Sequence, residues 1–328
     1  MLTVNQNLNR RDFLHGTTVL PLLAGAGASF ANLPLEAAEP IKRVGGPNLK
    51  ISLNAYSFTK ALNDNIKGRG KGMTLFDLLD FCAEHNFDAI DPTGYFFPGY
   101  PAPPSDEYIN NFKRRAFQLG LDISGTGVRN DFATPDDLPA RAGKPSRADD
   151  VRHAKEWVEV AAKLGAPVLR VFAGPVPEGE EWEAVAKRMA ADLRQVADHG
   201  AKFGVLVGVQ NHGDMLKTAT ETIKIVDMVD SDWFGVIVDT GYFMTPDPYV
   251  DIAQVMPYAV NMQVKESPFG KESEVRTDLP RLVTIIRDSG FRGYLPIETL
   301  SMPNRRYEPK ELVPQFLAEV RAALNQVG

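Results

Sequence analysis

Short apolar runs rich in β-branched residues alternate with longer amphipathic segments from residue 49 onward. The runs predict strands and the amphipathic segments predict helices. Eight strands are expected, over residues 50–58, 87–94, 121–128, 167–174, 205–213, 234–243, 260–267 and 294–300. A helical segment follows each of them. This order indicates parallel strands joined by right-handed helical crossovers.

Glycines end several of the predicted helices just before the next strand, as expected where the residue after a helix adopts a positive φ. They are Gly120, Gly165, Gly204 and Gly290. The chain has no glycine-rich nucleotide-binding turn after its first strand, which disfavours a doubly wound open sheet. Eight strand-helix units fill a barrel without remainder. We therefore expect a single-domain (β/α)8 TIM barrel over residues 46–328.

The first 38 residues differ from the rest of the chain. Arg10 and Arg11 precede a weakly apolar stretch rich in Gly and Ala, with small-residue cleavage options over residues 24–28. The pattern predicts a twin-arginine export signal and leader over residues 1–38, and a periplasmic protein. An ordinary amphipathic leader with a chance arginine pair is the alternative. The stretch is too short for a membrane span of about 20 residues, so we expect no stable membrane anchor.

Composition and charge exclude several classes of partner. Hydrophobic residues make up 44% of the chain and charged residues 24%, which is typical of a globular protein with a sizeable core. The net charge is -6 and no run of Lys or Arg occurs, so neither nucleic acid nor an anionic membrane surface is expected as a partner. The single cysteine, Cys82, rules out an intrachain disulfide. A small molecule is the expected partner, and a homo-oligomer stays open.

The carboxyl ends of the predicted strands carry mainly aromatic and polar residues. In a TIM barrel the active site lies at these ends, because the βα loops gather there. Aromatic faces beside a few hydrogen-bonding groups suit a polyol, whose C–H face stacks on the rings while its hydroxyls pair. We therefore predict a carbohydrate substrate, bound by Asn54, Tyr56, Tyr95, Arg129, Arg170, Asn211 and Tyr242.

Two acidic residues, Asp239 and Glu298, each follow an apolar run at the point where a barrel strand emerges. Two converging buried carboxylates repel each other unless a cation lies between them. With Gln210 and Gln263 they make four oxygen donors on four consecutive strands. This hard donor set predicts a divalent metal cation and favours Mn, Mg or Co over Zn. For either acid alone, a helix N-cap or a salt bridge with a loop arginine is the alternative.

Two further side chains at the strand ends are candidates for catalysis. His212 is the one histidine at a strand end, and it could bind a substrate oxygen, move a proton or bind the metal. Fixing the adjacent loop is the alternative. Lys265 could stabilise a developing enolate or form a Schiff base, and a solvated lysine paired with Glu266 is the alternative.

Four motifs, QNHGD, VDTGYF, QVKESPFG and PIETL, occur in this order on the last four predicted strands. With them, residues 48–325 resemble the xylose isomerase-like TIM-barrel superfamily of sugar isomerases and epimerases, and exported members of it above all. In ketose epimerases of that superfamily a Glu, an Asp, a His and a second Glu on those strands hold the metal. The resemblance places the Asp at Asp239 and the second Glu at Glu298. It places the first Glu at Gln210 and the His at Gln263, and both are departures.

These departures bear on the mechanism that the resemblance implies. Ketose epimerisation uses the two Glu ligands as bases on opposite faces of one carbon, and Gln210 cannot act as a base. One proton-transfer position is therefore empty unless His212 or Glu266 fills it. Glu298 remains as the other base, and in a β-elimination Lys265 or His212 could assist the leaving group.

The expected activity is that of a divalent-metal-dependent sugar isomerase/epimerase-type enzyme, which acts through a metal-stabilised enediolate. Two alternatives stay open. One is a lyase or hydratase that acts on keto-sugars or keto-glycosides by β-elimination. The other is an exported, non-catalytic sugar-binding barrel.

Overall fold

The computed structural model describes residues 39–135 and 145–327. The predicted export signal over residues 1–38 lies outside the described residues, so the expected export and periplasmic location stay predictions. Within the described part of the chain, no helix is long and apolar enough to cross a membrane.

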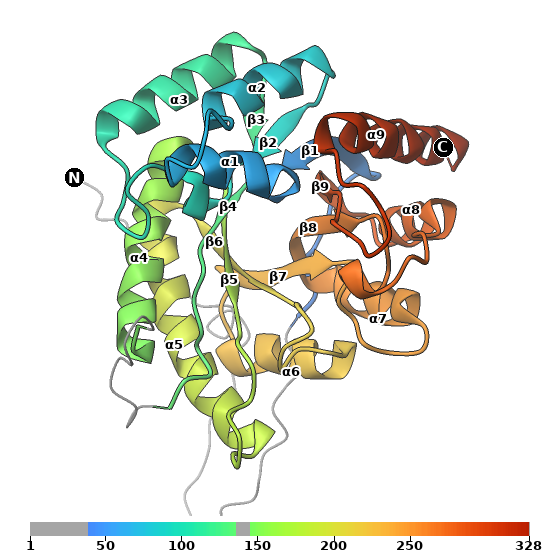
Figure 1. The fold of residues 1–328 in the computed structure, drawn as a ribbon. Coiled ribbons are helices and arrows are strands. Elements are labelled where there is room, and N and C mark those ends of the chain that lie inside the picture. The colour runs from blue at the N-terminus through green and yellow to red at the C-terminus, as the bar shows by residue number, and fades with distance from the viewer. Residues whose placement is uncertain (1–38, 136–144, 328) are drawn as a thin grey trace, which may run out of the picture. The chain divides into compact units, whose positions relative to one another are not determined.

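Parallel strands form the centre of the structure and helices surround them (Figure 1). The strands found in the described residues are β1 (Asn48–Asn54), β2 (Ala89–Asp91), β3 (Asp122–Ile123), β4 (Thr126–Gly127), β5 (Val168–Phe172), β6 (Leu206–Gln210), β7 (Phe234–Asp239), β8 (Ala259–Lys265) and β9 (Arg292–Glu298). Their order is β3-β2-β1-β9-β8-β7-β6-β5-β4, and every pairing is parallel. The predicted (β/α)8 TIM barrel is confirmed.

The third predicted strand is split into β3 and β4, and the split closes the ring. β3 pairs with β2, whereas β4 pairs with β5. Between them, Ser124 donates from its backbone N to the oxygen of Ile90 at 2.9 Å. A Cβ atom on Gly125 would lie 3.1 Å from both Asn261 Nδ2 and Asp91 Oδ2. A glycine at this break therefore leaves room for polar side chains inside the barrel.

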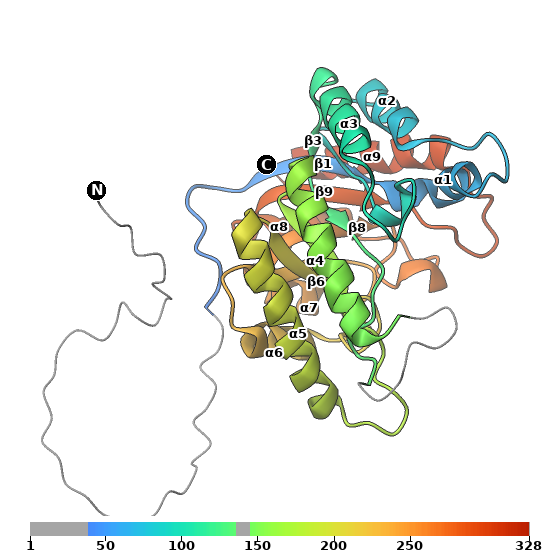
Figure 2. The ribbon, with the colours of Figure 1, turned by 90° about the vertical axis from the view of Figure 1, so that its left-hand side faces the viewer.

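All eight predicted helices are present, and α1 is an additional helix. The α-helices of the described residues are α1 (Thr59–Ile66), α2 (Leu75–Glu84), α3 (Asp106–Gln118), α4 (Arg147–Leu164), α5 (Trp182–Phe203), α6 (Ala219–Val229), α7 (Pro248–Val255), α8 (Leu279–Asp288) and α9 (Pro309–Gln326). Short 3-10 helices are η2 (Ala55–Phe58), η3 (Gly94–Phe96), η4 (Met256–Tyr258) and η5 (Gly270–Glu272). Figure 2 shows α3, α4 and α5 side by side on the outside of the barrel.

Local sequence signals explain where these helices begin and end. Thr74, Ser146 and Thr218 each form a capping box at the start of α2, α4 and α6, which satisfies backbone N–H groups that lack partners in the helix. Gly165 and Gly204 follow α4 and α5 in the left-handed conformation, as the sequence predicts.

Strand register brings the polar strand ends to one level of the barrel. Asp239 of β7 lies beside Gln263 of β8, and Lys265 of β8 lies beside Glu298 of β9. Side chains alternate along a strand, so Gln263 and Lys265 share one face of β8. These four polar residues thus come from three consecutive strands.

Helix α5 packs closely onto the start of β6 at Gly200. A Cβ atom there would lie 2.3 Å from the backbone oxygen of Val205. The backbone N of Val205 donates to the oxygen of Gly200 at 3.0 Å. This close contact between Gly200 and Val205 fixes where β6 begins. It therefore also fixes the position of Gln210 at the other end of the strand.

We expect Gly200→Ala to destabilise the protein, although alanine is the better helix former by about 1 kcal/mol. The neighbouring carbonyl belongs to the backbone and cannot move away, so overpacking should cost about 1–3 kcal/mol and outweigh that gain. Gly46→Ala, where an added Cβ meets nothing within 4 Å, is the control. Urea unfolding measures both variants, and equal stabilities would contradict the prediction.

Candidate active site

A cavity of about 310 Å³ opens at the carboxyl ends of the strands. Most of the residues predicted for the site line it. The lining consists of Asn54, Tyr56, Thr93, Tyr95, Arg129, Arg170, Phe172, Gly174, Pro175, Gln210, His212, Asp214, Gln263, Lys265 and Glu298. The lining combines aromatic rings with hydrogen-bonding groups, as expected for a site that binds a small polar molecule.

A buried cluster of three charged groups, which we call the Lys265 cluster, consists of Lys265, Asp239 and Glu298. Lys265 and Glu298 form the floor of the cavity, and Asp239 lies outside the lining. The Lys265 Nζ lies 2.6 Å from Glu298 Oε1 and 3.6 Å from Asp239 Oδ2. All three side chains are at most 5% exposed. Burial alone would lower the pKa of Lys265, but the charges of Asp239 and Glu298 outweigh burial and raise it. Lys265 is therefore an ammonium group at neutral pH.

Asp239 is held in place by groups on three sides. Gln210 donates from Nε2 to Asp239 Oδ2, and Gly241 donates from its backbone N to Asp239 Oδ1 at 2.9 Å. Asn211 exchanges two hydrogen bonds of 2.9 Å with the backbone of Asp239. Burial raises the pKa of Asp239 to about 6, and Lys265 opposes this shift, so the carboxylate is mainly ionised at pH 7.

The side chain of Asn211 is fully buried, and it makes both of these hydrogen bonds with the backbone of Asp239. It joins β7 to the end of β6 and does not line the cavity. The structure thus places Asn211, predicted as a substrate contact, behind the site. There it fixes the position of Asp239.

Gln263 takes part in a hydrogen-bond chain that leads away from the Lys265 cluster. Its Oε1 accepts from Asn54 Nδ2 at 2.6 Å. Asn54 Oδ1 in turn accepts from the backbone N of Tyr56 at 2.8 Å and from Thr93 Oγ1 at 3.4 Å. The chain sets the orientation of both amides at the mouth of β1 and β8.

One wall of the cavity combines aromatic rings with two arginines. Arg170 donates from Nη2 to the hydroxyl of Tyr95 at 2.9 Å, and its guanidinium lies 4.1 Å from the ring centre of Phe172. Arg129 stacks over Tyr95 at 5.4 Å. Tyr56 meets Tyr95 edge-to-face at 6.3 Å. These contacts hold the rings of Tyr56, Tyr95 and Phe172 at the wall of the cavity.

His212 stands between two rings at the edge of the cavity. Its ring centre lies 4.8 Å from that of Phe172 and 4.2 Å from that of Tyr242. Burial, with the charges of Lys265 and Arg170, lowers the pKa of His212 to about 3. The imidazole is therefore neutral at pH 7 and is a weak base. Tyr242 itself supports His212 and lies outside the cavity lining.

A family model described as xylose isomerase-like TIM barrel matches residues 79–320. The chain belongs to this xylose isomerase-like family. A comparison with curated proteins found no match.

Several solved structures share the fold of this xylose isomerase-like chain. D-psicose 3-epimerase with D-tagatose, from Clostridium cellulolyticum H10, is 15% identical with a TM-score of 0.67, over 84% of this chain and 99% of that one. The 3-keto-D-glucoside 4-epimerase from E. coli is 13% identical with a TM-score of 0.64, over 84% and 99%. The IolI protein with a binding zinc atom is 16% identical with a TM-score of 0.66, over 85% and 99%.

The donor atoms at the Lys265 cluster do not fit the divalent metal that the sequence predicts. The two carboxylates share the ammonium of Lys265. Because a carboxylate only accepts, Gln210 turns its N–H group towards Asp239, and the Gln263 oxygen is already paired with Asn54.

Glu266, predicted as a further base, lies outside the cavity lining. It pairs with Arg276 at 2.8 Å and Arg305 at 2.6 Å, and it accepts from the backbone N of Leu300. Burial alone would raise the pKa of Glu266, but these partners outweigh it and lower the pKa. Glu266 therefore joins the end of β8 to the loop after β9 and does not pair with the neighbouring lysine.

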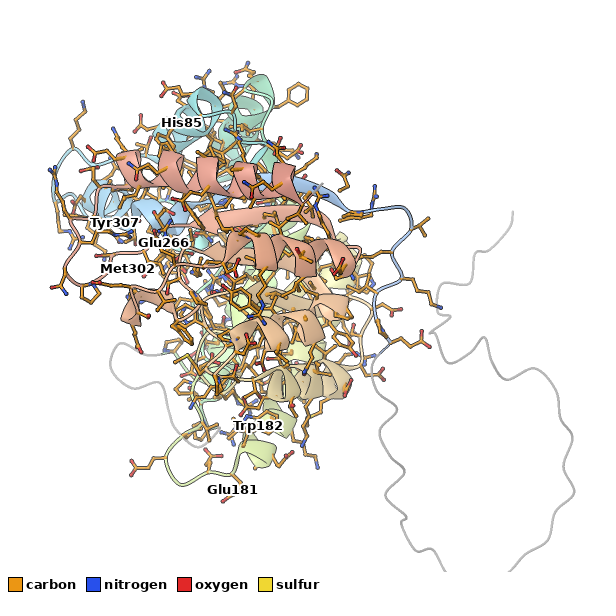
Figure 3. All side chains as sticks on the ribbon, turned by 90° about the vertical axis from the view of Figure 1, so that its right-hand side faces the viewer. His85, Glu181, Trp182, Glu266, Met302 and Tyr307 are labelled. Atoms are coloured by element: carbon orange, nitrogen blue, oxygen red, sulfur yellow. The ribbon has the colours of Figure 1, made fainter. Side chains whose placement is uncertain are left out.

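The same loop carries Met302 and Tyr307, which Figure 3 labels together with Glu266. The Tyr307 hydroxyl lies 2.7 Å from the backbone oxygen of Ser57 and 2.8 Å from Thr299 Oγ1. Met302 is buried. The loop is thus fixed to the barrel beside Glu298.

Sequence reasoning did not select Thr93, Asp214, Gly174 and Pro175, which also line the cavity. Asp214 accepts from the backbone N of Gly174 and of Leu216, both at 3.0 Å. Burial raises its pKa to about 6. Asp214 is the last residue of the motif QNHGD, and this motif was the one sequence signal that pointed to it. Its contact with the loop after β5 arises only in the folded chain.

The depressed pKa of His212 makes the stability of the protein depend on pH. Below pH 6.5 an unfolded histidine takes up a proton, whereas the folded one does so only near pH 3, so stability falls as the pH drops through this window. His212→Phe keeps the ring contacts and removes the titration. We expect wild type to lose up to about 2 kcal/mol more than the variant between pH 7 and pH 5 in urea unfolding. Equal losses would contradict this assignment.

Proposed function

We propose that this protein is a sugar isomerase/epimerase-type enzyme that removes and returns a proton next to the carbonyl group of a small sugar. The observation that carries the proposal is the pair of Lys265 and Glu298, which stand side by side at the floor of the cavity. A carboxylate can take the proton, and an ammonium can stabilise the oxygen that becomes negative.

Each group has a defined part in this chemistry. Glu298 accepts the proton when the C–H bond beside the carbonyl breaks, and the electron pair moves to the carbonyl oxygen. Lys265 donates a hydrogen bond to that oxygen and holds the resulting enediolate. The proton of the hydroxyl on the deprotonated carbon passes to the former carbonyl oxygen. Return of the proton from Glu298 to the former carbonyl carbon then completes an aldose-ketose isomerisation.

The walls of the cavity support a sugar as the substrate. Tyr56, Tyr95 and Phe172 offer ring faces to the C–H groups, and Arg129 and Arg170 offer donors to hydroxyl oxygens. At about 310 Å³ the cavity is at the small end of the range for ligand pockets, which is about 300–1,000 Å³. A single sugar ring or open chain suits this space.

The distribution of bases favours proton transfer on one face of the sugar. Besides Glu298, the one carboxylate in the lining is Asp214, and both of its oxygens accept backbone N–H groups. His212 is a weak base because its pKa is lowered to about 3. Isomerisation, which needs one base, is therefore favoured over epimerisation, which needs two.

NMR of sugars incubated with the protein in D₂O tests the proposal. Solvent deuterium should appear in an otherwise intact aldose or ketose. Loss of the aglycone from a 3-keto-glycoside would instead support a lyase that uses the same first step. Sugars that raise the melting temperature but gain no deuterium would leave a non-catalytic sugar-binding barrel.

Glu298→Gln should slow deuterium uptake by about 10²–10⁴-fold, the usual contribution of a general base. The amide keeps the size of the side chain but cannot accept the proton. Glu311→Gln, the same change at an exposed position on α9, is the matched control and should keep the wild-type rate. Substantial turnover by Glu298→Gln would show that another group is the base.

A further inference from the structure

We propose that the ammonium of Lys265 replaces a divalent metal ion in this barrel, so that the site binds the carbonyl oxygen of its sugar without any metal. The inference deepens the proposed function and rests on it. It concerns the position that the sequence assigns to a metal ion, between Asp239 and Glu298.

The strands deliver Lys265 directly to this position. Asp239, Lys265 and Glu298 stand at the ends of β7, β8 and β9, so the lysine comes from the strand between the two acids. Its Nζ lies within 4 Å of both carboxylates. A cation there satisfies two acids that would otherwise be buried without compensation.

The neighbouring chain leaves room for the lysine stem. A Cβ atom on Gly241 would lie 2.7 Å from Lys265 Cγ and 3.0 Å from Lys265 Cβ. Any larger residue at this position would clash with the lysine side chain, because Cγ is close to the backbone and cannot swing away. The backbone N of Gly241 also donates to Asp239. The turn after β7 therefore both holds one acid and admits the ammonium.

The remaining donors agree with an ammonium and disagree with a metal ion. A metal ion bound by both acids would lie close to the Lys265 Nζ, and the two positive charges would repel each other. Gln210 directs an N–H group at Asp239, whereas a ligand would have to direct its oxygen at the metal. Gln263 points its oxygen at Asn54.

An ammonium also suits the chemistry proposed for the site. It donates hydrogen bonds to the carbonyl oxygen in the ground state and holds the negative oxygen of the enediolate, and it stays protonated throughout. One proton moves between a sugar carbon and Glu298, and a second passes between the two sugar oxygens, so no further reactant is needed. The ammonium carries half the positive charge of a divalent ion, so it stabilises a negative oxygen less. This favours substrates in which a ketone already makes the neighbouring C–H group acidic.

Metal content and thermal stability test the inference on the full-length protein. We expect elemental analysis to find far less than one Mn, Mg, Co or Zn per chain. Adding each metal after treatment with EDTA should leave the melting temperature unchanged, and sugars should raise it equally with and without EDTA. One tightly bound metal ion would raise it by several degrees instead. Stoichiometric metal in wild type, or a metal-induced rise that Asp239→Asn abolishes, would overturn the inference.

Substitution of the lysine provides the second arm. Lys265→Met leaves two buried carboxylates without a cation, so we expect a lower melting temperature, a rise on adding MnCl₂ and no response to sugar in EDTA. Lys310→Met, at an exposed position on α9, is the matched control and should behave as wild type. A Lys265→Met protein that still responds fully to sugar in EDTA would overturn the inference.

A double variant covers the case in which Lys265→Met does not fold. Lys265→Met with Asp239→Asn removes one charge of each sign, and it should fold and respond to neither MnCl₂ nor sugar. An undiminished sugar response in this variant would overturn the inference. Stoichiometric metal in wild type overturns the metal replacement alone. A wild-type protein that no sugar stabilises, and that exchanges no deuterium, overturns the proposed function.

Discussion

Two buried carboxylates on β7 and β9 need a positive charge between them, and the arrangement of the site follows from that need. Removing one charged group from water costs several kcal/mol unless a partner compensates it. Lys265, on the strand between them, supplies the charge to both Asp239 and Glu298. Gln210 and Gly241 then complete the hydrogen bonds of Asp239. Lys265 and Glu298 both line the cavity, where, in the function that we propose, a carbonyl oxygen and its neighbouring C–H group meet them.

The rest of the barrel positions this cluster without taking part in the chemistry. Asn211 joins Asp239 to the end of β6, and Glu266 joins the end of β8 to the loop after β9 through two arginines. Neutral His212 stands between rings at the edge. Asn211 and Glu266 are thus engaged by protein partners, whereas Lys265 and Glu298 line the cavity as the pair to which we assign the proton chemistry.

Much of this arrangement could be predicted from the sequence, because alternation and strand ends are local signals. The eight strand positions and eight helices follow from periodicity, while the break at Gly125 and helix α1 depend on packing. The requirement for a cation beside Asp239 and Glu298 was also visible. Its source was not, because the reach of a four-carbon side chain past Gly241 is a tertiary property. The same holds for Glu266, whose arginine partners lie 10 and 39 residues further along the chain.

The most direct test is anomalous diffraction from crystals grown with MnCl₂ and soaked with a ketose. The account predicts a sugar oxygen within hydrogen-bond distance of the Lys265 Nζ and no anomalous peak between Asp239 and Glu298. A manganese peak at that position, or a sugar bound away from Lys265, would contradict it.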